Sequence, residues 1–107
     1  MKLILAVVQD IDADPAMKAL TEAGERVTRI ATTGGFFRQG NTTILCAADD
    51  DHVQPAIDIL QKICRKRTRA MPVSLEPSEA ALAGAYAEVP VGGATMLVFN
   101  IERFEQI

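Results

Sequence analysis

Residues able to bind a small ligand gather between positions 26 and 48, where two β-branched runs, 27–32 and 42–46, flank a glycine-rich connection. Two such runs joined by a short connection predict a β-hairpin. A plain hairpin tip needs only polar turn residues, and large aromatic side chains are costly to expose to water without a partner. This tip carries Phe36, Phe37, Arg38 and Asn41. We therefore expect the tip to hold a ligand.

The side chains of the tip suit a purine nucleotide. Phe36 and Phe37 offer faces on which a base can stack, and Arg38 offers a cation. The amide of Asn41 can both donate and accept hydrogen bonds toward a base edge. The alternative is that one Phe packs into the core or a subunit contact, and that Gly35 only serves turn geometry.

Arg26 and Thr28 lie two residues apart in the first run, so both point to the same face of the predicted strand. They can present a guanidinium and a hydroxyl side by side to a phosphate. The alternative is an ordinary exposed strand face.

The sequence offers no catalytic or metal-binding constellation. Residues 35–42 have the glycine spacing of a phosphate-binding P-loop, but Asn41 stands where that motif needs lysine, and a strand follows instead of a helix. The acidic triplet 49–51 lacks the spacing of a calcium loop and is expected to cap a helix. The single histidine, His52, has no recognisable nucleophile beside it. We expect no metal, no cofactor and no enzymatic activity.

Composition indicates one small domain spanning residues 1–107, since 107 residues with 49% hydrophobic content suffice for one core. A net charge of −3 and a pI near 5.0 argue against a nucleic-acid partner.

Cys46 and Cys64 lie in apolar contexts without the spacing of metal ligands, so buried reduced thiols and a cytoplasmic location are expected. The apolar run 3–8 is too short for a signal or membrane segment and predicts a buried strand.

Hydrophobic periodicity gives the order strand, helix, strand, strand, helix, strand. This order predicts a ferredoxin-like split βαβ sandwich of the α+β class, with two helices on one face of an antiparallel sheet. Residues 70–90 contain three prolines and no sustained period, and are expected to form a long loop, with Val89 and Val91 as a candidate start of a strand. Asp12 or Asp14 is expected to cap the first helix. The predicted strands are 2–9, 27–32, 42–46 and 95–101, and the predicted helices are 15–23 and 53–64.

Four sequence blocks resemble the PII-like cyclic di-AMP receptor family of bacterial signalling proteins. They are Val7–Asp10, Ile30–Phe36 with its ATTGGF motif, the GNTT motif of Gly40–Thr43, and Val91–Thr95 with its GGAT motif. The resemblance covers essentially the whole chain. It implies a homotrimer that binds one cyclic di-AMP in each cleft between neighbouring subunits, without catalysis. It also implies an unidentified protein target.

The resemblance also implies which residues contact the ligand. From one subunit these are Arg26, Thr28, Gly35, Phe36, Phe37, Asn41 and Ala47, and from the neighbour Gly92, Leu97 and Gln106. Ala47 stands where the family has glycine, and Phe37 where it has a smaller aliphatic residue. The segment 70–90 is shorter than in the family.

The sequence thus predicts a trimeric, cytoplasmic sensor that binds cyclic di-AMP and transmits its state through loops 36–39 and 70–90. One alternative is a sensor of another adenine nucleotide, ATP or ADP. Another is a trimeric adaptor without a nucleotide ligand. A phosphodiesterase is least favoured, because neither a metal cluster nor a general base can be assembled from the sequence.

Overall fold

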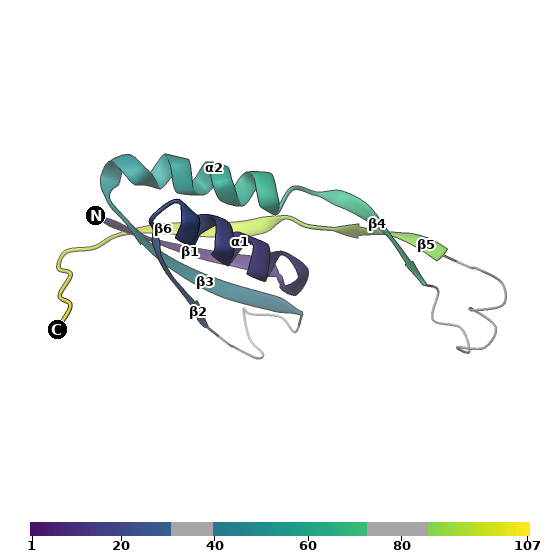
Figure 1. Ribbon diagram of the computed structural model, residues 1–107, viewed down its shortest axis with the longest axis horizontal. Coiled ribbons are helices and arrows are strands. Elements are labelled where there is room, and N and C mark those ends of the chain that lie inside the picture. The colour runs from purple at the N-terminus through teal and green to yellow at the C-terminus, as the bar shows by residue number, and fades with distance from the viewer. Residues whose placement is uncertain (31–39, 73–85) are drawn as a thin grey trace.

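A computed structural model describes residues 1–30, 40–72 and 86–107. They form a four-stranded sheet with two helices on one face, and a two-stranded arm that extends away from it (Figure 1). The elements are β1 (Lys2–Gln9), α1 (Asp10–Glu22), β2 (Arg26–Ile30), β3 (Asn41–Ala48), the 3₁₀ turn η1 (Asp50–His52), α2 (Val53–Ile63), β4 (Arg67–Pro72), β5 (Tyr86–Val91) and β6 (Ala94–Asn100). No helix in these ranges is long and apolar enough to cross a membrane.

The four strands of the sheet lie in the order β2, β3, β1, β6, and every neighbouring pair is antiparallel. One helix follows β1 and the other follows β3, so the chain returns to the sheet each time on the same side (Figure 1). This is the mixed α+β architecture that the sequence predicted, and it is consistent with a ferredoxin-like fold.

The core lies between the sheet and the helices. Alternate residues of the central strand β1, Ile4, Ala6 and Val8, are no more than 1% exposed, and they pack with Leu20 of α1 and Leu60 of α2. Alternation along a strand sends every second side chain to the same face. The intervening residues of β1 must therefore point away from the helices.

The second face of the sheet is apolar, and neither helix covers it. Leu5 of β1 pairs with Leu45 of β3 on one side and Leu97 of β6 on the other. Leu97 is 41% exposed, and Phe99 on the same face is 48% exposed. We call this surface the open face. It is made by the β1 residues Leu3, Leu5, Val7 and Gln9 and by the residues that pair with them in β3 and β6. An apolar sheet face of this kind is typical of an interaction surface.

Helix α1 begins at Asp10, five residues before the predicted start. The prediction was wrong because β1 runs directly into the helix, with Gln9 as the N-cap residue and no side-chain cap. Neither predicted cap serves that role: Asp12 is buried and pairs with Arg67, whereas Asp14 pairs with Arg29 on the surface. Asp10 and Asp12 still complement the positive end of the helix dipole.

The structure describes strands at both ends of the predicted loop 70–90, which was expected to hold a strand only from Val89. Strands β4 and β5 pair from Arg67 with Val91 to Pro72 with Tyr86. Residues 87–90 of β5 are all exposed, so no alternation of apolar and polar residues reveals the strand. Prolines are compatible with such an arm because its outer edges need no ladder hydrogen bonds.

The acidic triplet does not cap α2 as expected. Asp49 precedes η1 without a side-chain cap hydrogen bond, and α2 follows His52, which also makes no such bond. Asp50 instead pairs with the amino group of Met1 at 2.8 Å. Cys46 and Cys64 are buried free thiols, as predicted.

Candidate functional site

Strand register places five of the expected site residues on the open face. Arg26 pairs with Ala47, which pairs with Leu3. Two residues further along β2, Thr28 pairs with Leu45 of β3. Leu45 pairs with Leu5 of β1, which pairs with Leu97 of β6. At the far end of β3, Asn41 lies opposite Gln9. The residues brought to one face are Arg26, Thr28, Asn41, Ala47 and Leu97.

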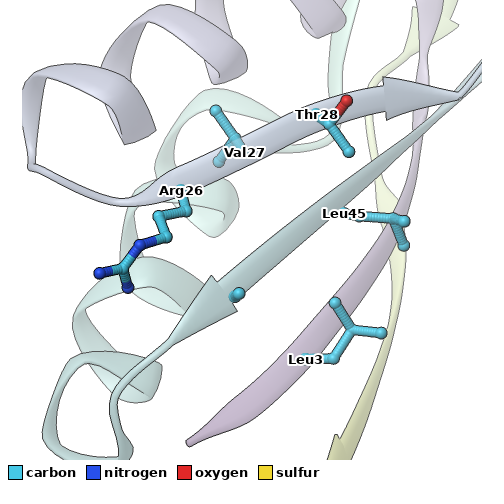
Figure 2. Close-up of a pocket in the computed structure, with 6 residues that line it drawn as sticks. Leu3, Arg26, Val27, Thr28 and Leu45 are labelled. Atoms are coloured by element: carbon cyan, nitrogen blue, oxygen red, sulfur yellow. The ribbon is translucent and has the colours of Figure 1, made fainter. Parts of the chain in front are cut away.

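Arg26 and Thr28 line a cavity of about 260 Å³ at one end of the open face, which we call the arginine end. Leu3, Leu45 and Ala47 also line this cavity. Figure 2 shows the Arg26 side chain extending from the start of β2 and the Thr28 hydroxyl further along the strand. An apolar wall with a guanidinium and a hydroxyl at its edge suits a base attached to a phosphate.

The C-terminal tail reaches the arginine end. The Ile101 N–H donates a hydrogen bond to the Met1 carbonyl at 3.1 Å, which extends the pairing of β6 with β1 to the start of the tail. The Cζ of Arg26 then lies 5.4 Å from the centroid of the Phe104 ring. This is a cation–π contact, and it helps to fix the guanidinium in place. The sequence did not predict that Phe104 lies beside Arg26, because only its aromatic type distinguished it within a short polar tail.

Asn41 lines two cavities at the opposite end of the face, which we call the amide end. One cavity has a volume of about 300 Å³ and includes Lys66 and Gly92 in its lining. The other has a volume of about 450 Å³ and includes Arg69 of the arm. Gln9 lines both cavities. The amide end therefore combines two carboxamides with two cations, a polar setting for a nucleotide.

The backbone at position 92 requires glycine. Its φ of +95° lies in the left-handed region, and an added Cβ would overlap the carbonyl oxygen of Arg65. Its N–H donates to the side-chain oxygen Oε1 of Gln9 at 2.6 Å. The turn between the arm and β6 is thus fixed against the last residue of β1.

The two ends of the site are well separated. Asn41 and Ala47 stand six residues apart on β3, which corresponds to about 20 Å along the strand. Leu97 lies three strands across the sheet from Thr28, or about 14 Å. Leu97 therefore lies on the opposite edge strand of the sheet from the cavity beside Arg26.

A family model described as cyclic-di-AMP receptor matches residues 1–107, the whole chain. The chain belongs to the cyclic-di-AMP receptor family. A solved structure, that of a functionally unknown protein from Pediococcus pentosaceus ATCC 25745, is 33% identical with a TM-score of 0.78. That match covers 99% of this chain and 96% of the other.

Among the described residues that the receptor resemblance implicated, Leu97 and Gln106 line none of the three cavities. Gly35, Phe36 and Phe37 lie outside the described residues. Gln106 is exposed in the tail beyond Phe104. Leu3, Leu45 and Gln9 were missed, because their place at the site depends on strand pairing and not on any motif.

Burial and hydrogen bonding raise the pKa of several titratable groups that lie outside the cavities. Burial raises the pKa of both Cys46 and Cys64 to about 11, so these thiols stay protonated at neutral pH. His52 Nδ1 lies 2.9 Å from Glu25 Oε1, and this hydrogen bond raises the pKa of His52. Within the described ranges, no three His, Cys, Asp or Glu side chains are grouped so as to hold a metal ion. A receptor family suggests a non-enzymatic role.

Proposed function

We propose that this chain is a single-domain, non-enzymatic signalling receptor for cyclic di-AMP. The observation that carries the proposal is that strand register gathers Arg26, Thr28, Asn41 and Ala47, all implicated by the family resemblance, on one face. Membership in a cyclic-di-AMP receptor family supports the choice of ligand.

The chemistry of the two ends fits a ligand with two adenines and two phosphates. Arg26 and Thr28 both donate charge-assisted hydrogen bonds to a phosphate, and the adjoining cavity takes one base. Asn41 hydrogen-bonds the edge of the other base, about 13 Å along β3 from Leu45, the residue that pairs with Thr28. Gly35, Phe36 and Phe37, in the segment joining β2 to β3, are proposed to complete the stacking surface.

We propose that the receptor is a homotrimer with its ligand in the clefts between subunits. The open face is apolar, with Leu97 and Phe99 exposed, and association would bury it. The family resemblance assigns Leu97, Gly92 and Gln106 to the neighbouring subunit, and Leu97 of the same chain lies on the opposite edge strand from Arg26.

Ligand occupancy is proposed to be transmitted to a protein target by rearrangement of segments 36–39 and 70–90. Support comes from the amide end, where Asn41, Arg69 and Val91 line one cavity and so link the site to the base of the arm. Hydrogen exchange with and without ligand tests this step. Equal protection in both states would remove the proposed output.

Calorimetry with cyclic di-AMP, cyclic di-GMP, ATP and AMP tests the ligand. We expect selective binding of cyclic di-AMP and no breakdown of it by the pure protein. Preference for ATP would make the chain an adenine-nucleotide sensor of another kind. Absence of binding by all four would favour a trimeric adaptor, and appreciable turnover of cyclic di-AMP would contradict a receptor.

A further inference from the structure

Gln9 stands directly beside Asn41 at the amide end. It is the last residue of β1, it is half-buried, and it pairs with Asn41 in the antiparallel register. Direct cross-strand neighbours have Cβ atoms about 5 Å apart on the same face. Two side-chain carboxamides therefore lie next to each other where two cavities meet.

The orientation of the Gln9 amide is set by Gly92. The Gly92 backbone nitrogen lies 2.6 Å from the Gln9 side chain, and a backbone N–H can only donate. The Gln9 atom at that position must therefore be its oxygen, Oε1. Its amino group, Nε2, is then the group left to interact with other partners.

Gly92 itself is held in place, so this orientation is rigid. The Arg67 guanidinium donates to the carbonyl of Arg65 at 2.9 Å and to the buried carboxylate of Asp12 at 2.7 Å. Arg65 is the residue whose carbonyl abuts Gly92. Within residues 1–30, 40–72 and 86–107, no group accepts a hydrogen bond from Gln9 Nε2.

We propose that Gln9 is a ligand-binding residue that donates from Nε2 to a ring nitrogen of adenine. The inference rests on the proposed function. Adenine carries its N6 amino donor next to a ring-nitrogen acceptor, N7 on one edge and N1 on the other. Asn41 accepts from N6 while Gln9 donates to the adjacent ring nitrogen. The two carboxamides together match the donor and acceptor order of the base.

Two substitutions separate this role from a structural one. Gln9→Glu keeps an oxygen to accept from Gly92 but removes both Nε2 donors, whereas Gln9→Met keeps the shape and removes both functions. We expect both variants to bind cyclic di-AMP about ten- to a hundredfold more weakly than wild type. The amide resonance of Gly92 should stay in place in Gln9→Glu and shift in Gln9→Met.

Analogues of cyclic di-AMP test the same bond on wild-type protein, independently of how the variants fold. With carbon in place of N7 or of N1, one of the two analogues should bind about tenfold more weakly. If both analogues bind like cyclic di-AMP, or if folded Gln9→Glu binds like wild type, Gln9 only positions Gly92 and the inference is wrong. If wild type does not bind cyclic di-AMP at all, the proposed function fails, and this inference with it.

Discussion

The Nη2 of Arg67 lies 2.7 Å from Oδ1 of Asp12, joining the start of β4 to the first turn of α1. The Asp12 side chain is only 3% exposed, whereas that of Arg67 is 29% exposed. The hydrogen bond that Arg67 donates to Asp12 raises the pKa of Arg67, so the guanidinium stays protonated. The arm is thereby tied to the helical layer at a buried carboxylate.

Replacing Arg67 should destabilise the fold more than replacing other cations of the arm. Arg67→Met leaves the buried Asp12 carboxylate without its partner, whereas Arg69→Met removes an exposed side chain. Urea denaturation should show a clearly lower midpoint for Arg67→Met, and Asp12→Leu combined with Arg67→Met should recover part of the loss. Equal midpoints for the two single variants would contradict a stabilising pair.

Stability should fall as pH rises through neutrality because of His52. Glu25 raises the pKa of His52 above its usual 6.5, so protonated His52 stabilises the folded state. This stabilisation is fully present below the unfolded pKa and is lost as pH rises through the higher folded pKa. Denaturation from about pH 5.5 to about pH 8.5 should therefore show the advantage of wild type over His52→Gln shrinking with pH. A constant difference across this range would show that the pair is not coupled to folding.

The two cysteines should resist alkylation in the native protein. Burial raises the pKa of Cys46 and Cys64 to about 11, which leaves little reactive thiolate at neutral pH. Mass spectrometry after iodoacetamide treatment should find both thiols unmodified in native protein and modified in urea. Rapid labelling of either thiol in native protein would show that its side of the core opens.

Introducing charge on the open face should dissociate the proposed trimer. Leu97→Asp places a carboxylate where association would bury an apolar side chain, whereas Gln61→Asp on the exposed side of α2 is a matched control. Light scattering should give a trimer for wild type and Gln61→Asp, and a smaller species for Leu97→Asp. A trimer in all three would place the interface elsewhere.

Of two substitutions at opposite ends of the site, only Asn41→Ala should weaken cyclic di-AMP binding. Asn41→Ala removes a base-edge partner and should weaken binding about ten- to a hundredfold. Ala47→Gly removes a methyl group from the wall of the cavity beside Arg26 and should leave binding equal or tighter. Calorimetry on variants with native unfolding curves measures both. Weaker binding by Ala47→Gly would show that the methyl contacts the ligand favourably.

The sequence predicted those elements whose apolar pattern matched their burial. The continuous run of β1 and the periodic stripe of α2 were found nearly residue by residue. The start of α1 was missed because residues 10–14 are mostly acidic and resemble a cap, although they belong to the helix. The arm was missed because its exposed strand residues carry no alternation of apolar and polar side chains.

The site was predictable only in part, for a similar reason. Arg26, Thr28 and Asn41 were predicted by residue type and by the motifs around them, and strand pairing places them on one face. Leu3 and Gln9 reach the same surface only because β1 pairs with β3 in a particular register, which local sequence does not encode.

A titration of isotopically labelled protein with cyclic di-AMP, followed by amide resonances, tests the central claim most directly, because it reports binding and its location together. The account predicts saturable shifts for Arg26, Thr28, Asn41 and Ala47 on the open face, and little change for the helix residues Lys18 and Lys62 on the opposite side. Absence of any shift, or shifts confined to the helices, would contradict it.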